Sequence, residues 1–482
     1  MTESISYPGL LVALLQPWLL GCIWTRWLLL KSGRWNWFIL LGFGYFLGIF
    51  FTTVLMRLSD AVGAGLNFSG LATAMALLIV AGVSLQLKQV VPQQAPKATV
   101  AISPWQTVLL AILLTLLAWR YLTILQELLL RPLYAWDAWM NWAPKAIVWF
   151  HLGELVDYVK PEQWLAQAPD ANQYTLGNRQ ASEYPPTVPL ILLWSMMGAQ
   201  NWDHSALFLP WFLAAINLGF ALYGQLRLNG CQVLPAALAC YLLLNLPYYN
   251  VHTVLAGYAD IWLAAAFGLS IFALREWHLN RSWRYGLLCV LMAVLCSQLK
   301  VPGIVLAAIL LAAFFRSWLN PSHKWELIAA LVLVAVIALL LLFGIELNIP
   351  WLGRLVISAD AIEIPRIGQF ELAFHPVWKP FAISMFVMIN WNIAWYLLLL
   401  LTLVAIFRGA LFRQASPEAL AILGALLFVA LAFFMTRHHT AAENFVTLNR
   451  ALLYLVPALV FCVFAHVKGT RIQTNRHSAS TG

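Results

Sequence analysis

Asp137 is the side chain best placed to do chemistry, because it stands in an aromatic run, WDAWMNWAPKA, directly after a long apolar stretch. Arg131 and Pro132 stop the preceding helix, and Asp137 begins a new helical stretch. A carboxylate at such a place can act as a general base, and indoles such as those of Trp136 and Trp139 favour a membrane surface. The alternative role is a helix N-cap, for which Asp is a preferred residue.

Three basic residues are candidates for binding an anion near this carboxylate. Lys300 lies in SQLKVPG between two apolar runs, Arg437 follows a later run, and Arg450 lies inside the last one. An arginine inside an apolar helix is costly unless it meets a partner, so Arg450 is the stronger candidate. Its alternative is an ion pair with Glu443 or Asp260, and the alternative for Lys300 is snorkelling to lipid headgroups.

The remaining acidic residues have simpler interpretations. Asp260, in GYADIW, begins an apolar run, where capping is the alternative to a place in a site. Acids in the segment after Asp137 are expected to form a solvated face; they are Asp157, Glu162, Asp170 and Glu183. No metal-binding or nucleotide-binding motif is present, and the six cysteines form no CxxC pair. We expect no metal and no cofactor.

The composition decides which elements must position these residues. Of the 482 residues, 62% are hydrophobic and 10% are charged, which excludes a soluble globular protein. Apolar runs long enough to cross a bilayer recur along the whole chain. The sequence predicts an all-α polytopic membrane protein with about thirteen transmembrane helices, at 9–30, 36–57, 67–87, 104–126, 204–226, 232–247, 258–275, 284–299, 302–318, 325–345, 380–407, 418–436 and 446–467.

The distribution of charge predicts the orientation of these helices, because Lys and Arg concentrate in cytoplasmic loops. With the N-terminus outside and the short run 184–198 treated as a helix lying at the interface, the inner loops hold most of the 28 Lys and Arg residues. Only Glu276, Glu326 and Glu418 of the 19 acidic residues lie there. If 184–198 spanned the membrane, the later basic loops would move outside. The long segments 127–203 and 346–379 are then both external, and the basic surplus needs no nucleic acid as partner.

In their order along the chain, four motifs resemble the GT-C glycosyltransferases. The motifs are WDAWMNWAPKA, EYPPTVPLILLWSMMG, GYADIWLAAAF and SQLKVPGIVLA, over roughly residues 104–345. The similarity is to the bacterial branch that includes the protein mannosyltransferase-like and aminoarabinose-transferase-like enzymes. It implies a GT-C module at 103–345 with interfacial helices in the outer loop 127–203. Three additional helices in 1–102 would precede this module, and an outer loop with three helices in 346–482 would follow it.

The resemblance also implies a reaction. A sugar would pass, with inversion, from a polyprenyl-phosphate carrier to an unidentified acceptor at the outer face of the inner (plasma) membrane, towards the periplasm or exterior. Asp137 matches the catalytic acid of the family and would act as general base. Lys300, Arg450 and Arg437 would bind the donor phosphate, and the substrate-binding residues would be Trp136, Trp139, Glu183, Tyr184 and Asp260.

The chain departs from the family pattern at one position, and two rival functions stay open. Many relatives carry a clear second acid or His before the PPL-like segment, where this chain reads Ser182-Glu183-Tyr184, so Glu183 is the candidate for that role. The first rival is a transporter or lipid flippase, which would pair its acids on broken helices at the membrane midplane. The second is a noncatalytic scaffold of the cell envelope.

Overall fold

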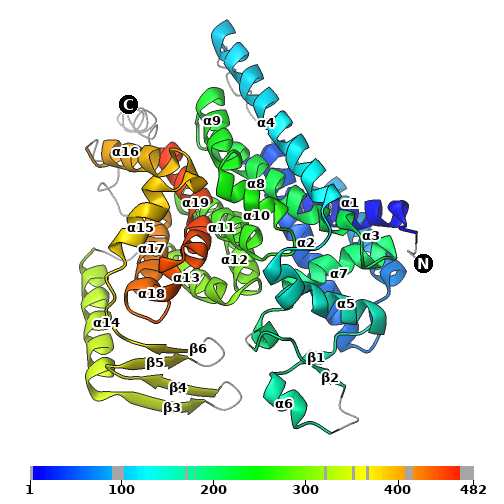
Figure 1. The fold of residues 1–482 in the computed structure, drawn as a ribbon. Coiled ribbons are helices and arrows are strands. Elements are labelled where there is room, and N and C mark those ends of the chain that lie inside the picture. Colours follow the sequence, from blue (N-terminus) through cyan, green and yellow to red (C-terminus); the bar gives the residue numbers. More distant parts are fainter. Residues whose placement is uncertain are drawn as a thin grey trace.

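The structure of the protein is a computed structural model. It describes residues 4–89, 102–168, 172–179, 181–319, 323–349, 353–364, 368–407 and 416–466. Helices make up most of this part of the chain (Figure 1). Within it, eight helices are long and apolar enough to cross a membrane. The eight are α1 (Tyr7–Leu30), α2 (Trp37–Ala61), α3 (Phe68–Leu87), α4 (Pro104–Leu130), α8 (Leu209–Leu228, with the 3-10 turn Ser205–Phe208), α13 (Val301–Leu319), α17 (Pro417–Phe434) and α19 (Val446–His466).

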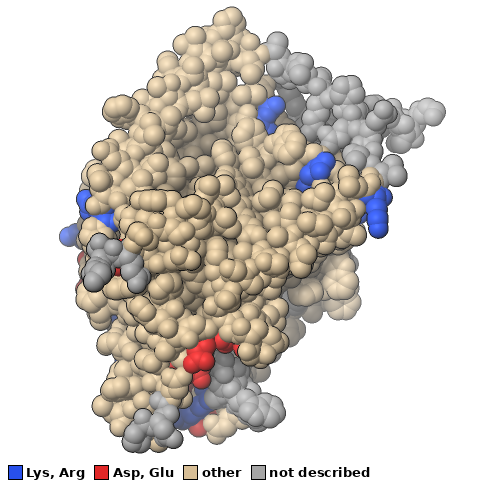
Figure 2. Space-filling model, turned by 90° about the vertical axis from the view of Figure 1, so that its right-hand side faces the viewer, with Lys and Arg blue, Asp and Glu red and all other residues tan. Residues whose placement is uncertain are grey.

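Further helices complete the bundle, and the longer ones among them are apolar, which agrees with a polytopic membrane protein. They are α9 (Val233–Leu244), α10 (Pro247–Val254), α11 (Asp260–Asn280), α12 (Trp283–Ser297), α14 (His323–Phe343), α16 (Ala394–Phe407) and α18 (His439–Glu443). Figure 2 shows one face of the molecule, on which few charged side chains interrupt the surface. The count of thirteen spans stays a prediction.

Local sequence accounts for where the first helices begin. The side chains of Ser6, Asn36 and Asn67 each accept a hydrogen bond from a backbone N–H in the first turn of α1, α2 and α3. At the other end of α4, the helix stops at Leu130, before Arg131 and Pro132, as the sequence predicts.

α11 forms the centre of the bundle, and every side chain from Asp260 to Trp277 in it is buried. It packs against α8, α12 and α19. The N-terminal helices join this body directly, because α2 packs against both α1 and α8. Between α1 and α2 the backbones are in close contact: a Cβ atom on Gly21 would stand 1.8 Å from the carbonyl oxygen of Gly44. Small residues permit such close packing of membrane helices.

The segment between α4 and α8 is more buried than the sequence predicts. It contains the π-helical turn Ala138–Trp142, α5 (Ala143–Leu152), β1 (Asp157–Tyr158), α6 (Pro161–Leu165), β2 (Gln173–Tyr174), the 3-10 turn Ala181–Glu183 and α7 (Thr187–Ala199). β1 and β2 pair in parallel. Trp139, Trp142 and Trp149 follow a spacing of three to seven residues that would suit a helix lying at the headgroups, but Trp142 and Trp149 are buried against protein rather than lipid. Of these three indoles, only that of Trp139 is substantially exposed.

α7 covers most of residues 184–198, and all thirteen of its residues are buried against other parts of the protein. The expected position of this segment at the membrane interface stays a prediction. α7 packs against α1 and α5, and the indole N–H of Trp194 donates to the carbonyl of Ala13 at 2.8 Å. At 1.5 Å of rise per residue, a thirteen-residue helix is about 20 Å long, too short for a hydrocarbon core of about 30 Å.

The second long segment, which is expected to be only a loop, contains a small sheet. Its four strands, antiparallel in the order β3-β4-β5-β6, are β3 (Ile345–Ile349), β4 (Gly353–Ile357), β5 (Ala361–Ile364) and β6 (Gly368–Glu371). Leu347 pairs with Leu355, and Ile362 with Phe370. In Figure 1 the sheet lies beside the lower part of α14 and below α18, at the end of the bundle opposite the free end of α9.

The single helix expected at 380–407 is wrong, because the segment breaks. It consists of α15 (Trp378–Ala382), a π-helical turn (Ile383–Val387), a 3-10 turn (Ile389–Trp391) and α16. Asn392, with φ 47°, stands at the break. The amide oxygen of Asn449 in α19 accepts hydrogen bonds from Ser384 Oγ at 2.8 Å and Trp391 Nε1 at 2.9 Å. These buried polar contacts hold the broken segment against α19.

Candidate functional site

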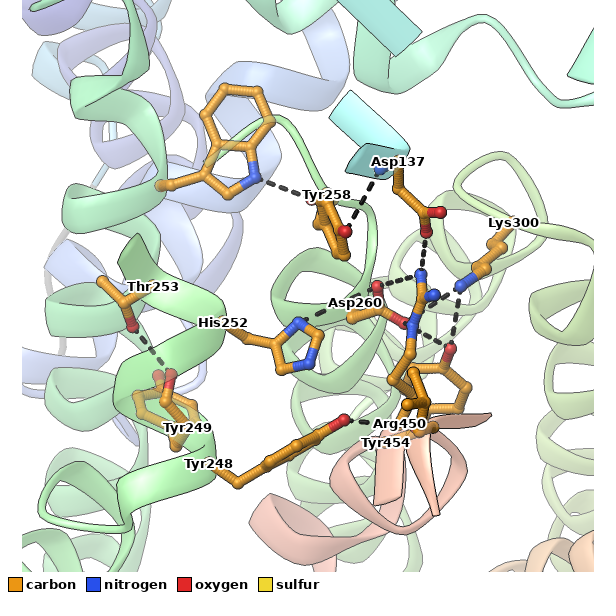
Figure 3. Close-up of polar contacts among 12 residues, drawn as sticks. Asp137, Tyr248, Tyr249, His252, Thr253, Tyr258, Asp260, Lys300, Arg450 and Tyr454 are labelled. Carbon is orange, nitrogen blue, oxygen red and sulfur yellow. Dashed lines mark hydrogen bonds and ion pairs between the residues drawn. The ribbon is translucent and has the colours of Figure 1, made fainter. Parts of the chain in front are cut away.

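Four charged residues that are far apart in the sequence meet at one end of the helix bundle (Figure 3). Asp137 precedes the π-helical turn, Asp260 is the first residue of α11, and Lys300 lies between α12 and α13. Arg450 is the fifth residue of α19. Each of these positions is at or within about one turn of a helix end, so the ends of several helices together build the site.

Asp260 is the centre of this cluster and is fully buried. Its carboxylate accepts from Arg450 Nε at 3.0 Å and Nη2 at 2.7 Å, in the two-point geometry that suits a guanidinium. It also accepts from Lys300 Nζ at 3.0 Å and from the Tyr454 hydroxyl at 2.5 Å. A buried carboxylate is tolerated only when it is paired and hydrogen-bonded in this way.

Asp137 approaches the same guanidinium from the other side. Its Oδ2 accepts from Arg450 Nη2, and its Oδ1 accepts from Asn141 Nδ2 at 3.3 Å. Its backbone N–H donates to the Tyr258 hydroxyl at 3.1 Å, and the ring of Tyr258 lies 5.0 Å from the Arg450 guanidinium carbon. The Asp137 side chain is 13% exposed, whereas that of Asp260 is fully buried. Of the two carboxylates, only that of Asp137 is therefore accessible.

The capping roles considered for the two acids do not apply. Neither the π-helical turn after Asp137 nor α11 receives a side-chain capping hydrogen bond. The N-cap position of α11 is instead Ala259, and Asp260, the first residue of the helix, points its carboxylate to the cations. Of the alternatives for Arg450, an ion pair with Asp260 is present, and a second pair with Asp137 accompanies it.

The other predicted site residues have different surroundings. Trp136 and Trp139 are exposed. Tyr184 stacks on Trp142 with ring centroids 5.1 Å apart, and burial, followed by the negative charge of Asp137, raises its pKa. Glu183 pairs with Lys160 at 2.7 Å. Glu183 is thus bound elsewhere, which argues against its proposed role as a second acid in the cluster.

Arg437 is the predicted residue that the structure does not bring to the cluster. Its side chain is exposed, and among the described residues no hydrogen bond or ion pair joins it to Asp137, Asp260 or Lys300. It follows α17, in the turn before α18.

Sequence reasoning missed two members of the cluster. Tyr454 donates to Asp260 and also lies 3.2 Å from Lys300 Nζ. It stands four residues after Arg450, so helical spacing alone puts both on one face of α19. His252 Nδ1 lies 3.9 Å from Asp260 Oδ2 and comes from the short helix α10, which no sequence pattern ties to Asp260.

The cluster has balanced charge and one accessible base. Two carboxylates stand against one guanidinium and one ammonium. Burial, followed by the charge of Arg450, lowers the pKa of Lys300, while nearby Asp260 opposes this shift. In the described residues no three His, Cys, Asp or Glu side chains are arranged to hold a metal ion. The arrangement suits proton transfer by Asp137 beside cations that stabilise anionic groups.

Comparisons of the chain with protein-family models, with curated proteins and with solved structures find no match. The resemblance to the GT-C glycosyltransferases therefore stays a prediction.

Proposed function

We propose that the protein is a GT-C membrane glycosyltransferase that moves a sugar from a polyprenyl-phosphate carrier to an acceptor at the outer face of the inner (plasma) membrane. The observation that carries this proposal is the meeting of Asp137 with Arg450, Asp260 and Lys300 at one end of the bundle. An accessible carboxylate beside two cations fits a reaction in which a proton is removed and a phosphate leaves.

In the proposed reaction the acceptor hydroxyl or amine attacks the anomeric carbon while its proton passes to Asp137. The bond between that carbon and the phosphate oxygen breaks, and its electron pair leaves with the phosphate. Oδ1 of Asp137 is the better base atom, because it accepts only one long hydrogen bond, from Asn141. Attack opposite the leaving phosphate inverts the anomeric centre.

The buried acid then has a positioning role. Asp260 fixes Arg450 through two hydrogen bonds and Lys300 through one, so both cations are held before the substrate arrives. Donors that are already oriented stabilise developing charge without reorganising during the reaction. Exposed Trp136 and Trp139 would pack against the sugar and the headgroup region.

The location of the cluster favours this enzyme over a transporter or flippase. A transporter of the inverted-repeat type binds its substrate at broken helices near the membrane midplane. Here Asp260 opens α11, Lys300 precedes α13, and Arg450 is in the second turn of α19. The helix that does break, between α15 and α16, contacts Asn449 rather than either acid of the cluster.

Replacement of the proposed base tests this function directly. We expect Asp137→Asn to lower transfer from a polyprenyl-phosphate sugar by about 100-fold or more, since general-base catalysis typically contributes 10²–10⁴-fold. The assay measures product in membranes that contain the full chain, with glycan mass spectrometry of the envelope to identify the acceptor. Asp157→Asn is the matched control, because Asp157 is an exposed acid of the same segment in β1.

Two measurements make the result specific. Size-exclusion profiles and melting temperatures of the variants in detergent separate lost chemistry from lost fold. Near-normal transfer by a well-folded Asp137→Asn protein would overturn the assignment of Asp137 as base. Absence of transfer by the wild-type chain with every lipid-linked sugar tested would overturn the function itself.

A further inference from the structure

The charge balance of the cluster leaves a donor phosphate without a counter-charge. Asp137 and Asp260 already neutralise Arg450 and Lys300, so a bound phosphate would add negative charge to a neutral group. A buried anion without compensation is costly. A further cation that no carboxylate neutralises is therefore needed close to the helix ends that form the site.

Arg57 is a cation that no carboxylate in the described part of the chain neutralises. It lies near the end of α2, is only partly exposed, and donates from Nη1 to Gln298 Oε1 at 2.8 Å and from Nη2 to Thr187 Oγ1. Both partners are neutral. Its Nε is buried and has no hydrogen-bond partner, and among the described residues no carboxylate lies within ion-pair distance of it.

The two partners tie Arg57 to segments that flank the cluster. Gln298 is two residues before Lys300, in the same connection between α12 and α13. Thr187 opens α7, three residues after Tyr184, whose pKa responds to the charge of Asp137. Lys300 itself uses two of its three N–H donors on Asp260 and Tyr454. Among the described residues, one donor of Lys300 and the buried Nε of Arg57 thus have no hydrogen-bond partner.

We propose that Arg57 binds the phosphate of the lipid-linked donor and supplies the positive charge that the Asp137–Arg450–Asp260–Lys300 cluster lacks. This inference rests on the proposed function and deepens it, because it assigns a residue of the N-terminal helices to the donor site. The leaving phosphate is then held between the α2 end and the connection that carries Lys300. A guanidinium suits this role because its planar fork binds two phosphate oxygens at once.

Binding of a polyprenyl monophosphate to the purified full-length protein tests this assignment without any transfer assay. The titration is followed by tryptophan fluorescence in detergent micelles, and the matching polyprenol, which lacks the phosphate, is the control ligand. We expect Arg57→Gln to weaken phosphate binding by about 10- to 100-fold, as loss of a charged hydrogen bond does, and to leave polyprenol binding unchanged. Arg57→Lys, which keeps the charge, should lose less than Arg57→Gln.

A second variant keeps the test valid if Arg57→Gln fails to fold. Gln298→Glu would place a carboxylate beside Arg57 and neutralise its charge without moving the arginine. If the role of Arg57 were purely structural, this change would not weaken phosphate binding. We expect it to weaken phosphate binding by about 10-fold. Gln298→Met removes the same hydrogen bond without adding charge, and should bind the phosphate within about 3-fold of wild type.

The possible outcomes separate this inference from the proposed function. Phosphate binding by Arg57→Gln and Gln298→Glu within about 2-fold of wild type would overturn the role of Arg57, even if Asp137→Asn abolishes transfer. Equal losses for the polyprenol would also overturn it. Phosphatidylglycerol provides the other source of phosphate: if it displaces the polyprenyl phosphate one for one, Arg57 is a headgroup contact and the donor assignment is wrong.

Discussion

Arg450 determines the geometry of the cluster, because one guanidinium joins both carboxylates. Its Nε and Nη2 bind Asp260, and Nη2 also binds Asp137. A lysine at this position offers a point charge on a flexible stem and could not hold two carboxylates in one fixed plane. The distance between the buried acid and the accessible base is thus set by a rigid side chain, which is what a positioned general base requires.

Lys145 is a second buried cation near the site, and it holds the segment that carries Tyr184. Its Nζ donates to the carbonyls of Ser182 and Tyr184, each at 3.3 Å, and lies 5.4 Å from the centre of the Tyr158 ring. The side chain is almost completely buried in α5. Burial lowers the pKa of Lys145 from its ordinary value of 10.5 to about 8.

This shift predicts a pH dependence of stability. Between pH 8 and 10.5 the unfolded chain binds more protons at Lys145 than the folded chain does, so the free energy of unfolding rises with pH. The contribution is at most about 1.4 kcal/mol per pH unit in that window. Lys145→Met should remove it, which melting temperatures in detergent from pH 7.5 to 10 would detect.

Lys160→Met is the matched control, since Lys160 is a more exposed lysine of the same segment between α4 and α8, paired with Glu183. It should keep the wild-type slope of melting temperature against pH. If Lys145→Met shows the same slope as wild type, Lys145 is not the group responsible.

At the residue scale, the sequence predicts which residues belong to the cluster better than it predicts which contacts they make. Asp137, Asp260, Lys300 and Arg450 could be chosen because each charged residue lies at or near the end of an apolar run. Arg57 has the same signal, but nothing in its neighbourhood distinguishes it from a snorkelling residue. Its importance follows only from its neutral partners, which depend on packing between helices that are distant in the chain.

Two elements must touch for the site to form: the turn before α11 and the π-helical turn after Asp137. Gly257, with φ 91°, lies in the first, and a Cβ added there would stand 2.6 Å from the Cβ of Ala138 in the second. The same turn continues to Tyr258, which accepts from the Asp137 backbone N–H and whose carbonyl accepts from Trp211 Nε1 at 2.6 Å. Glycine is required here by both conformation and contact.

Gly257→Ala should therefore separate Asp137 from its partners. We expect it to lower transfer by about 100-fold, the effect of a misplacement of about 1 Å, and to destabilise the fold by about 1–3 kcal/mol through overpacking. Gly63→Ala is the matched control, because Gly63 has φ 77° but nothing within 4 Å of an added Cβ. Similar transfer rates for the two variants would show that contact with Ala138 does not position Asp137.

At the element scale, apolar runs predict helices well and other structures poorly. The long runs became helices because burial and backbone hydrogen bonding favour the same outcome in an apolar chain. The sheet β3–β6 was missed because each strand has only four or five residues, too few for a clear alternation. The break between α15 and α16 was missed because Asn449, which holds it, lies in another helix.

Across the whole molecule, α11 links two charged groups at its opposite ends. Asp260 opens the helix in the site, and Glu276, sixteen residues later, accepts from Arg34 Nε at 2.9 Å and from Asn229 and Asn280. At 1.5 Å per residue the two carboxylates are about 24 Å apart along the axis. That separation approaches the thickness of the hydrocarbon core, so we expect the site and the Glu276 network to lie on opposite sides of the membrane.

The orientation of the molecule decides which side holds the site, and it can be measured by labelling. The excess of Lys and Arg near Lys31 and Glu276 predicts that this end is cytoplasmic and that the Asp137 end is external. In intact cells an impermeant maleimide should label Asp157→Cys, whereas Lys31→Cys should react only after permeabilisation. Both positions are exposed, and the wild-type chain is the blank, because its described cysteines are buried or half-buried. The reverse pattern would put Asp137 and Arg57 at the cytoplasmic face, where a lipid-linked donor at the outer face could not reach them.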